Sequence, residues 1–215
     1  MSNTVAYALT VLLGYLLGSI PTGFLVAKAK GIDIRTVGSG NIGATNAFRI
    51  LGKGAGIFVL LADACKGFVA CEFLPMFVPQ IFPAADVAPA HIGLVAGVAA
   101  ILGHNYTCWL YFKGGKGIAT SAGVLFTLAP AAAATILAVW IILFFATKYV
   151  SLASIAASAT LPFAQWFWSK GQNPEMIYIF AGLAALAIYK HKANIQRLLA
   201  GTEGKIGAKK KEPVT

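Results

Sequence analysis

Long apolar stretches alternate with short polar segments along the whole chain. The apolar stretches lie near residues 4–27, 55–78, 87–112, 118–130, 132–147, 152–168 and 175–189. About 20 apolar residues suffice to cross a bilayer as a helix. The uncharged run 117–147 would form a helix of roughly 46 Å, too long for a hydrocarbon core of about 30 Å, so we place a turn at Ala129-Pro130. The pattern predicts an all-α, polytopic membrane protein with about seven transmembrane helices.

The basic residues indicate how these helices are oriented. Four polar segments, 28–53, 113–117, 148–151 and 190–215, hold fifteen of the seventeen Lys and Arg residues. Basic loops face the cytoplasm, so we expect all four on that side, with the N-terminus outside and the C-terminus cytoplasmic. No basic residue precedes the first apolar stretch, so we do not expect it to be a cleaved signal.

The domain organisation follows from the same pattern. We expect residues 1–200 to form a single transmembrane catalytic domain. The remaining segment, GTEGKIGAKKKEPVT, residues 201–215, has no apolar face. We expect it to be a basic, disordered cytoplasmic tail close to anionic lipid.

Composition excludes several other classes of protein. The chain is 58% hydrophobic and 11% charged, with a mean hydropathy of +0.76, which is more apolar than a soluble domain can bury. The net charge of +10 is dispersed between apolar stretches, so we expect no nucleic-acid partner. None of the three cysteines forms a C-x-x-C pair and no carboxylate cluster is present, so we expect no metal site.

The polar segment RTVGSGNIGATNAFRILGKG, residues 35–54, contains a G-x-G-x-x-G pattern, with Asp63 twenty residues further on. A dinucleotide-binding fingerprint needs a preceding strand, whereas this segment follows a transmembrane helix and Asp63 lies in the next one. Glycine instead permits positive φ and exposes successive N–H groups as an anion-binding nest. The predicted phosphate-binding groups are Gly38, Gly40 and Gly43, the donors Ser39, Asn41, Thr45 and Asn46, and the guanidinium of Arg49.

A second glycine-rich segment, KGGKG at residues 113–117, opens the next helix on the same side of the membrane. Backbone N–H groups at the start of a helix bind anions, and residues without a Cβ let a phosphate come close. Leu110 and Ile118 stand where a Walker A loop needs Gly and Ser or Thr. The predicted phosphate-binding residues are Gly114, Gly115, Lys116 and Gly117.

Two further polar segments complete the cytoplasmic side. KYVSLAS carries Ser151 and Ser154, and KHKANIQR carries His191, Asn194 and Arg197, spaced three apart on one helical face. Four polar ends rich in phosphate-type donors indicate more than one bound phosphate.

Each feature also has a simpler interpretation. The glycines of the first segment could serve only to connect two helices. The lysines of KGGKG could be topology signals or snorkelling anchors, and the serines of KYVSLAS could cap a helix. His104 and Asn105 then only close a helix. Asp63 and Lys66 are harder to dismiss, because ionisable groups at membrane depth are normally functional or paired; we expect them to pair with each other.

Six motifs carry a resemblance to a known family: GSGNIGATNAFR, LADACKG, GHN, KGGKGIAT, KYVSLAS and KHKANIQRLL, in this order over nearly the whole chain. They resemble the bacterial acyl-phosphate:glycerol-3-phosphate acyltransferase family. The resemblance implies an inner-membrane enzyme of phospholipid biosynthesis that transfers a fatty acyl group from acyl phosphate to the sn-1 hydroxyl of glycerol 3-phosphate, giving lysophosphatidic acid and phosphate. It implies acyl phosphate, glycerol 3-phosphate and membrane lipid as partners, no cofactor, and an active site on the cytoplasmic face.

The residues and the resemblance together predict the site. Two phosphorylated substrates bring up to four negative charges together, and basic side chains must offset their repulsion. The predicted catalytic residues are Ser39, Asn41, Arg49, Lys116 and Ser154. The predicted contacts to substrate phosphate are Gly38, Gly40, Gly43, Thr45, Gly114, Gly115, Gly117, His191 and Asn194. Which loop holds which phosphate stays open.

The chemistry expected at this site follows from what the sequence lacks. It has neither the H-x-x-x-x-D pattern of acyl-CoA-dependent glycerophosphate acyltransferases nor a G-x-S-x-G elbow. We therefore expect the phosphate of the donor to accept the hydroxyl proton. The alternative is a small transporter for a phosphorylated solute, which would place polar groups through the membrane midplane; a regulatory scaffold would leave the glycine loops unexplained. The order of the motifs favours the enzyme.

Overall fold

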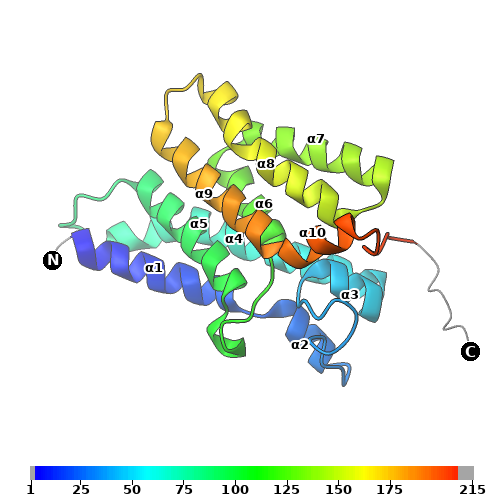
Figure 1. Ribbon diagram of the computed structural model, residues 1–215. Coiled ribbons are helices and arrows are strands. Elements are labelled where there is room, and N and C mark those ends of the chain that lie inside the picture. Colours follow the sequence, from blue (N-terminus) through cyan, green and yellow to red (C-terminus); the bar gives the residue numbers. More distant parts are fainter. Residues whose placement is uncertain (1–2, 208–215) are drawn as a thin grey trace, which may run out of the picture. The chain divides into compact units, whose positions relative to one another are not determined.

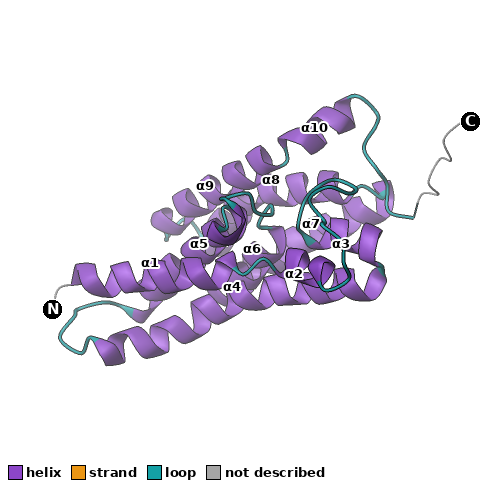
Figure 2. Ribbon diagram, turned by 90° about the horizontal axis from the view of Figure 1, so that it is seen from below, coloured by secondary structure: helices purple, strands orange, loops and turns teal. Residues whose placement is uncertain are grey.

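Residues 3–207 are described by the computed structural model, and every regular element in that range is helical (Figures 1 and 2). The bounds are α1 Asn3–Ser19, α2 Thr22–Lys28, α3 Ala44–Leu51, α4 Lys53–Ile81, α5 Pro89–Asn105, the 3-10 turn η1 Cys108–Leu110, α6 Ile118–Leu128, α7 Pro130–Thr147, α8 Val150–Ser169, α9 Pro174–Lys190 and α10 Lys192–Leu199. The predicted all-α class is confirmed.

Each predicted apolar stretch contains a helix, but the first stretch is divided. The chain leaves the helical path between α1 and α2, at Ile20 and Pro21, because proline has no N–H to continue the hydrogen-bond ladder. The turn predicted at Ala129-Pro130 is confirmed, since α6 ends at Leu128 and α7 begins at Pro130.

Within residues 3–207, four helical segments are long and apolar enough to cross a membrane: Asn3–Lys28, Pro89–Leu110, Pro130–Thr147 and Val150–Ser169. The α4 helix has 29 residues but carries Asp63 and Lys66, and α9 has 17 residues. Seven crossings and their orientation stay predictions.

The chain divides into two compact units, the first ending at Pro130 and the second beginning at Ala131. A single domain over residues 1–200 therefore stays a prediction.

In the first unit, α1 packs along α5, and α4 packs against α3, α5 and α6 (Figure 2). Small residues let α1 and α5 approach closely: a Cβ on Gly18 would overlap the backbone of Ala100. The C-terminal ends of the two helices are also joined by hydrogen bonds. The Thr107 hydroxyl donates to the Ser19 carbonyl, and the Tyr15 hydroxyl donates to the Tyr106 carbonyl at 2.6 Å. The break after α1 is thus held against the end of α5.

In the second unit, α8 packs against α9, and α10 contacts both helices (Figure 1). The chain then returns to the start of α8: the Ile206 N–H donates to the Lys148 carbonyl at 3.1 Å, and Glu203 is buried. Residues 201–207 thus differ from the disordered tail expected there, because the Glu203 carboxylate finds hydrogen-bond donors on α8 and α10. The rest of the predicted tail, residues 208–215, lies outside the described residues.

Candidate active site

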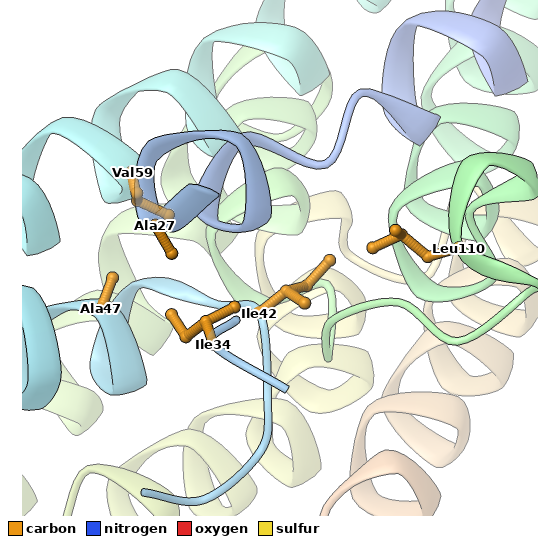
Figure 3. Close-up of a cluster of buried hydrophobic side chains, with 6 residues drawn as sticks. All are labelled: Ala27, Ile34, Ile42, Ala47, Val59 and Leu110. Carbon is orange, nitrogen blue, oxygen red and sulfur yellow. The ribbon is translucent and has the colours of Figure 1, made fainter. Parts of the chain in front are cut away.

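The first glycine-rich segment is built on an apolar cluster, which we call the loop cluster (Figure 3). Its members come from α2, the following loop, α3, α4 and η1: Ala27, Ile34, Ile42, Ala47, Val59 and Leu110. Ile34 and Ile42 belong to the loop itself and pack into this cluster, and Leu110 belongs to the turn that precedes KGGKG. The two glycine-rich segments therefore share one buried support.

Two asparagines fix the path of the first loop. The Asn46 carboxamide is 2% exposed; its Oδ1 accepts from the Ser39 N–H at 3.0 Å, and its Nδ2 donates to the Ile34 and Val37 carbonyls at 3.3 and 3.1 Å. The Asn41 Oδ1 accepts from the Gly43 N–H at 2.9 Å. Asn46 was expected to donate to phosphate, and here it organises the loop instead.

Three N–H groups of the predicted anion nest already donate to acceptors within the same segment. Those of Ser39 and Gly43 donate to asparagine side chains, and that of Gly40 donates to the Val37 carbonyl at 3.1 Å. Gly38 and Gly40 have φ of 62° and 68°, a region open to glycine. These two glycines shape the loop, and its side chains remain the candidate phosphate ligands.

The candidate side chains of this loop differ in exposure. Ser39 and Arg49 are exposed, Asn41 and Thr45 are partly buried, and Arg49 lies in the last turn of α3. Sequence reasoning missed α3 and treated residues 28–53 as a loop.

A surface ion pair lies beside this loop. The Arg35 guanidinium contacts the Asp33 carboxylate at 2.7 Å and lies 4.9 Å from the centre of the Phe24 ring. The hydrogen bonds from Arg35 lower the pKa of Asp33 to about 2.

The KGGKG segment lies on the last two residues of α5. The Gly115 N–H donates to the His104 carbonyl at 3.0 Å, and the Gly114 N–H donates to the Asn105 carbonyl at 3.2 Å. Those two N–H groups are therefore already used, contrary to the expectation that they bind phosphate. Gly117 has φ of 80° and immediately precedes α6. The Lys116 side chain and the N–H groups of the first turn of α6 remain candidates for binding an anion here.

A charged cluster lies beneath KGGKG. The predicted pairing of Asp63 with Lys66 is confirmed: Lys66 Nζ lies 2.8 Å from Asp63 Oδ1. His104 Nδ1 lies 3.6 Å from the same oxygen. The sequence alone does not indicate that a carboxylate lies near His104, because Asp63 is far away along the chain and only the packing of α4 against α5 brings them together.

The second unit brings its polar residues together around one carboxylate. Glu203 Oε1 accepts from the Ser151 hydroxyl at 2.8 Å and from Asn194 Nδ2 at 2.7 Å, and Oε2 accepts from Arg197 Nε at 2.7 Å. Burial raises the pKa of Glu203, but hydrogen bonds from Asn194, Ser151 and Arg197 outweigh it and hold the pKa below its usual value. Sequence reasoning missed Glu203, which lies in a stretch dominated by glycine and lysine.

Ser154 and His191, the other predicted site residues of this unit, are also held by hydrogen bonds. The Ser154 Oγ accepts from Trp140 Nε1 at 3.1 Å. His191 is buried, and its Nδ1 lies 2.7 Å from the Ala187 carbonyl. That contact requires the proton on Nδ1.

The structure thus gathers the predicted residues into two groups, one in each unit. The first group is carried by the two glycine-rich segments that share the loop cluster. The second lies on α8 and near the start of α10, where Ser151, Asn194 and Arg197 bond the Glu203 carboxylate. Among residues 3–207, no group of three or more His, Cys, Asp and Glu residues is placed to hold a metal ion.

Comparisons with known proteins agree on one family. Residues 8–201 match the family described as glycerol-3-phosphate acyltransferase. The chain is 45% identical over 209 residues to the glycerol-3-phosphate acyltransferase of Desulforudis audaxviator, covering 97% of this chain and 100% of that protein. It is 44% identical over 207 residues to that of Mesorhizobium japonicum, covering 96% and 99%.

Solved structures give the same result. The chain resembles PlsY, an integral membrane glycerol 3-phosphate acyltransferase, in its glycerol 3-phosphate form, with a TM-score of 0.80, 39% identity, and coverage of 94% of this chain and 96% of that chain. For the lysophosphatidic acid form of PlsY the TM-score is 0.77 and the identity 38%, with coverage of 94% and 95%.

Proposed function

The chain belongs to the glycerol-3-phosphate acyltransferase family, and we propose that it transfers a fatty acyl group from acyl phosphate to the sn-1 hydroxyl of glycerol 3-phosphate. The products are lysophosphatidic acid and phosphate, and the reaction supplies phospholipid biosynthesis. The protein acts in the bacterial inner membrane, with its active site on the cytoplasmic face. Family membership favours this enzyme over a transporter.

One observation carries the choice of acceptor and product. PlsY, 39% identical over nearly the whole chain, has been solved in a glycerol 3-phosphate form and in a lysophosphatidic acid form. These two molecules are the acceptor and the product of a single acyl transfer. In the chain itself, two glycine-rich segments that bear Arg49 and Lys116 share the loop cluster, which supports recognition of phosphate groups.

The proposed catalytic residues are Ser39, Asn41, Arg49, Lys116 and Ser154. Arg49 and Lys116 offset the negative charge of the substrates' phosphate groups, which is greatest when both substrates are bound. Thr45, His191 and Asn194 contribute further polar contacts in their own units. Among these, Asn194 also donates to Glu203 through Nδ2.

The proposed acyl donor fits this set of side chains. The sn-1 oxygen bonds to the acyl carbon, the bond from that carbon to the phosphate oxygen breaks, and the hydroxyl proton passes to the leaving phosphate. Phosphate is a good leaving group and carries its own proton acceptor, so no side chain has to serve as the base. The chain's role is then to bind both phosphates and to align the hydroxyl with the acyl carbon.

The test uses purified protein, acyl phosphate and radiolabelled glycerol 3-phosphate, with acyl-CoA in a parallel reaction. We expect labelled lysophosphatidic acid with acyl phosphate only, together with one phosphate released per acyl group transferred. Removal of the phosphate with a phosphatase, followed by periodate, distinguishes the position of the acyl group. The 1-acylglycerol then has two adjacent free hydroxyls and is cleaved, whereas a 2-acylglycerol is not. Transfer from acyl-CoA at an equal rate would overturn the proposed donor, and a 2-acyl product would overturn the proposed position.

A further inference from the structure

The charged cluster of Asp63, Lys66 and His104 has no part in the proposed acyl transfer. The three side chains are only 3–5% exposed. Besides its ion pair with Asp63, Lys66 Nζ donates to the Ile20 carbonyl at 3.0 Å, at the break between α1 and α2. Buried ionic groups cost free energy unless they are paired, and at membrane depth they are normally functional. We therefore expect this cluster to have a function.

His104 connects this cluster to KGGKG in two ways. Its carbonyl accepts from the Gly115 N–H at 3.0 Å, and its imidazole lies directly against Gly115, so that a Cβ at residue 115 would overlap Nε2. The next residue, Asn105, repeats the arrangement: its carbonyl accepts from Gly114, and its Oδ1 would lie 2.7 Å from a Cβ on Gly117. The backbone of KGGKG is thus shaped by the end of α5.

The two nitrogens of the His104 ring have different neighbours. Nδ1 faces the Asp63 carboxylate, and Nε2 is covered by Gly115. A general base must reach the proton that it removes, and a ring enclosed in this way does not present a nitrogen to a substrate hydroxyl. This geometry indicates support for the loop rather than proton transfer.

We propose that Asp63 and His104 are positioning residues for KGGKG. Asp63, held by Lys66, fixes the His104 ring; the ring and its carbonyl fix Gly115; and Gly115 sets the direction of the adjacent Lys116 side chain and of the start of α6. The proposal rests on the proposed function only for the statement that Lys116 binds substrate phosphate. The conformation of residues 113–117 can be measured whether or not the protein catalyses this reaction.

The first experiment measures the order of the loop directly. The double variant Asp63→Asn with Lys66→Met removes both charges, so that neither is left buried alone. Amide hydrogen exchange is followed by mass spectrometry in peptides that cover residues 113–117. We expect exchange there to become about tenfold faster or more, because the N–H groups of Gly114 and Gly115 depend on a fixed α5 end. The control is Asp86→Asn, an exposed carboxyl before the opposite end of α5.

The same variants separate positioning from general stabilisation. A displaced Lys116 weakens phosphate binding, so we expect the KM for glycerol 3-phosphate to rise about tenfold while kcat changes less than about threefold. The exchange of α1 peptides should match that of the Asp86→Asn control. Unchanged exchange at residues 113–117, or faster exchange throughout the first unit, would overturn the proposal.

The second experiment tests the contact between His104 and Gly115. We expect Gly115→Ala to lower kcat/KM about a hundredfold in the natural chain, but less than about fivefold when His104→Ala has already removed the ring. If Gly115→Ala does not fold, recovery of folded protein by adding His104→Ala gives the same support. Equal losses in both backgrounds, or no recovery, would contradict it.

The exchange result separates this inference from the proposed function. A natural chain that transfers no acyl group, with faster exchange in the double variant, would refute the function and leave the positioning role in place. Normal acyl transfer with unchanged exchange would refute the positioning role alone.

Discussion

Gly38 shows how one residue determines the shape of the first loop. Its φ is 62°, and a Cβ there would overlap Asn46 Oδ1, the atom that accepts from the Ser39 N–H. Any side chain at this position therefore strains the backbone and displaces the asparagine at once. The glycine is needed for the conformation of the loop, whether or not phosphate is bound.

We predict that Gly38→Ala lowers the free energy of unfolding by about 1–3 kcal/mol and raises the KM for glycerol 3-phosphate. The matched control is Gly54→Ala, in the first turn of α4, where a Cβ meets nothing within 4 Å. Alanine is favoured over glycine in a helix by about 1 kcal/mol, so the control should retain or gain stability. Thermal unfolding in detergent and steady-state kinetics measure both effects; equal behaviour of the two variants would contradict the assigned role.

Arg49 and Lys116 allow a second test at the same scale. If they bind substrate phosphates, replacing either with Met should cost about 2–5 kcal/mol in transition-state stabilisation, measured from kcat/KM. Lys53→Met is the control, because Lys53 lies at the exposed start of α4 and carries the same charge. If the lysines and arginine serve only as topology signals, all three variants will keep near-normal turnover.

At the scale of elements, local patterns predicted most of the helices. The seven apolar stretches each contain a helix, and the Ala129-Pro130 turn separates α6 from α7 because proline marks it in the sequence. The α3 helix was missed. With eight residues it is too short to be stable alone, and it depends on contact with α4, where a Cβ on Gly56 would overlap Phe48.

At the site too, contacts between residues close in sequence could be predicted, and contacts that depend on packing could not. Asp63 and Lys66 are one turn apart, so their ion pair could be predicted from the sequence. The approach of His104 to Asp63, and of Glu203 to Ser151, depends on packing between elements that are distant along the chain. The loop N–H groups were predicted to be available because sequence does not show which acceptors the folded loop brings to them.

Glu203 joins two elements, since its carboxylate binds α8 through Ser151 and α10 through Asn194 and Arg197. Its pKa is lowered in the folded state, so its stabilising effect is full above the unfolded pKa of about 4.3 and is lost as the pH falls through the folded value. Glu203→Gln should cost on the order of 2 kcal/mol near neutral pH. The difference from the natural chain should shrink as the pH is lowered below about 4.3.

Thermal unfolding between pH 7 and about pH 2 measures this effect, because the loss of stabilisation lies below the unfolded pKa. Glu175→Gln, an exposed carboxyl in the first turn of α9, is the control and should change stability little at any pH. A constant difference between Glu203→Gln and the natural chain across this range would show that the charge of Glu203 does not contribute.

At the scale of the whole molecule, the distribution of charge decides between two membrane topologies. The four segments that are long and apolar enough by themselves would give four crossings. Starting from an outer N-terminus, four crossings put KGGKG and the basic C-terminal segment outside. Seven crossings add α4, α6 and α9 and put fifteen of the seventeen basic residues on the cytoplasmic side. Because basic loops remain in the cytoplasm, we predict seven.

Single cysteines distinguish the two topologies. In a version with Cys65, Cys71 and Cys108 replaced, new cysteines at Lys113 and Lys205 should be shielded from an impermeant thiol reagent applied to intact cells, and one at Ala84 should react. Four crossings predict the reverse at all three positions. These positions are exposed in the fold, so labelling reports the side of the membrane rather than burial, and permeabilised cells should label all three. Reaction of the cysteines at Lys113 and Lys205 from outside would refute seven crossings and a cytoplasmic KGGKG together.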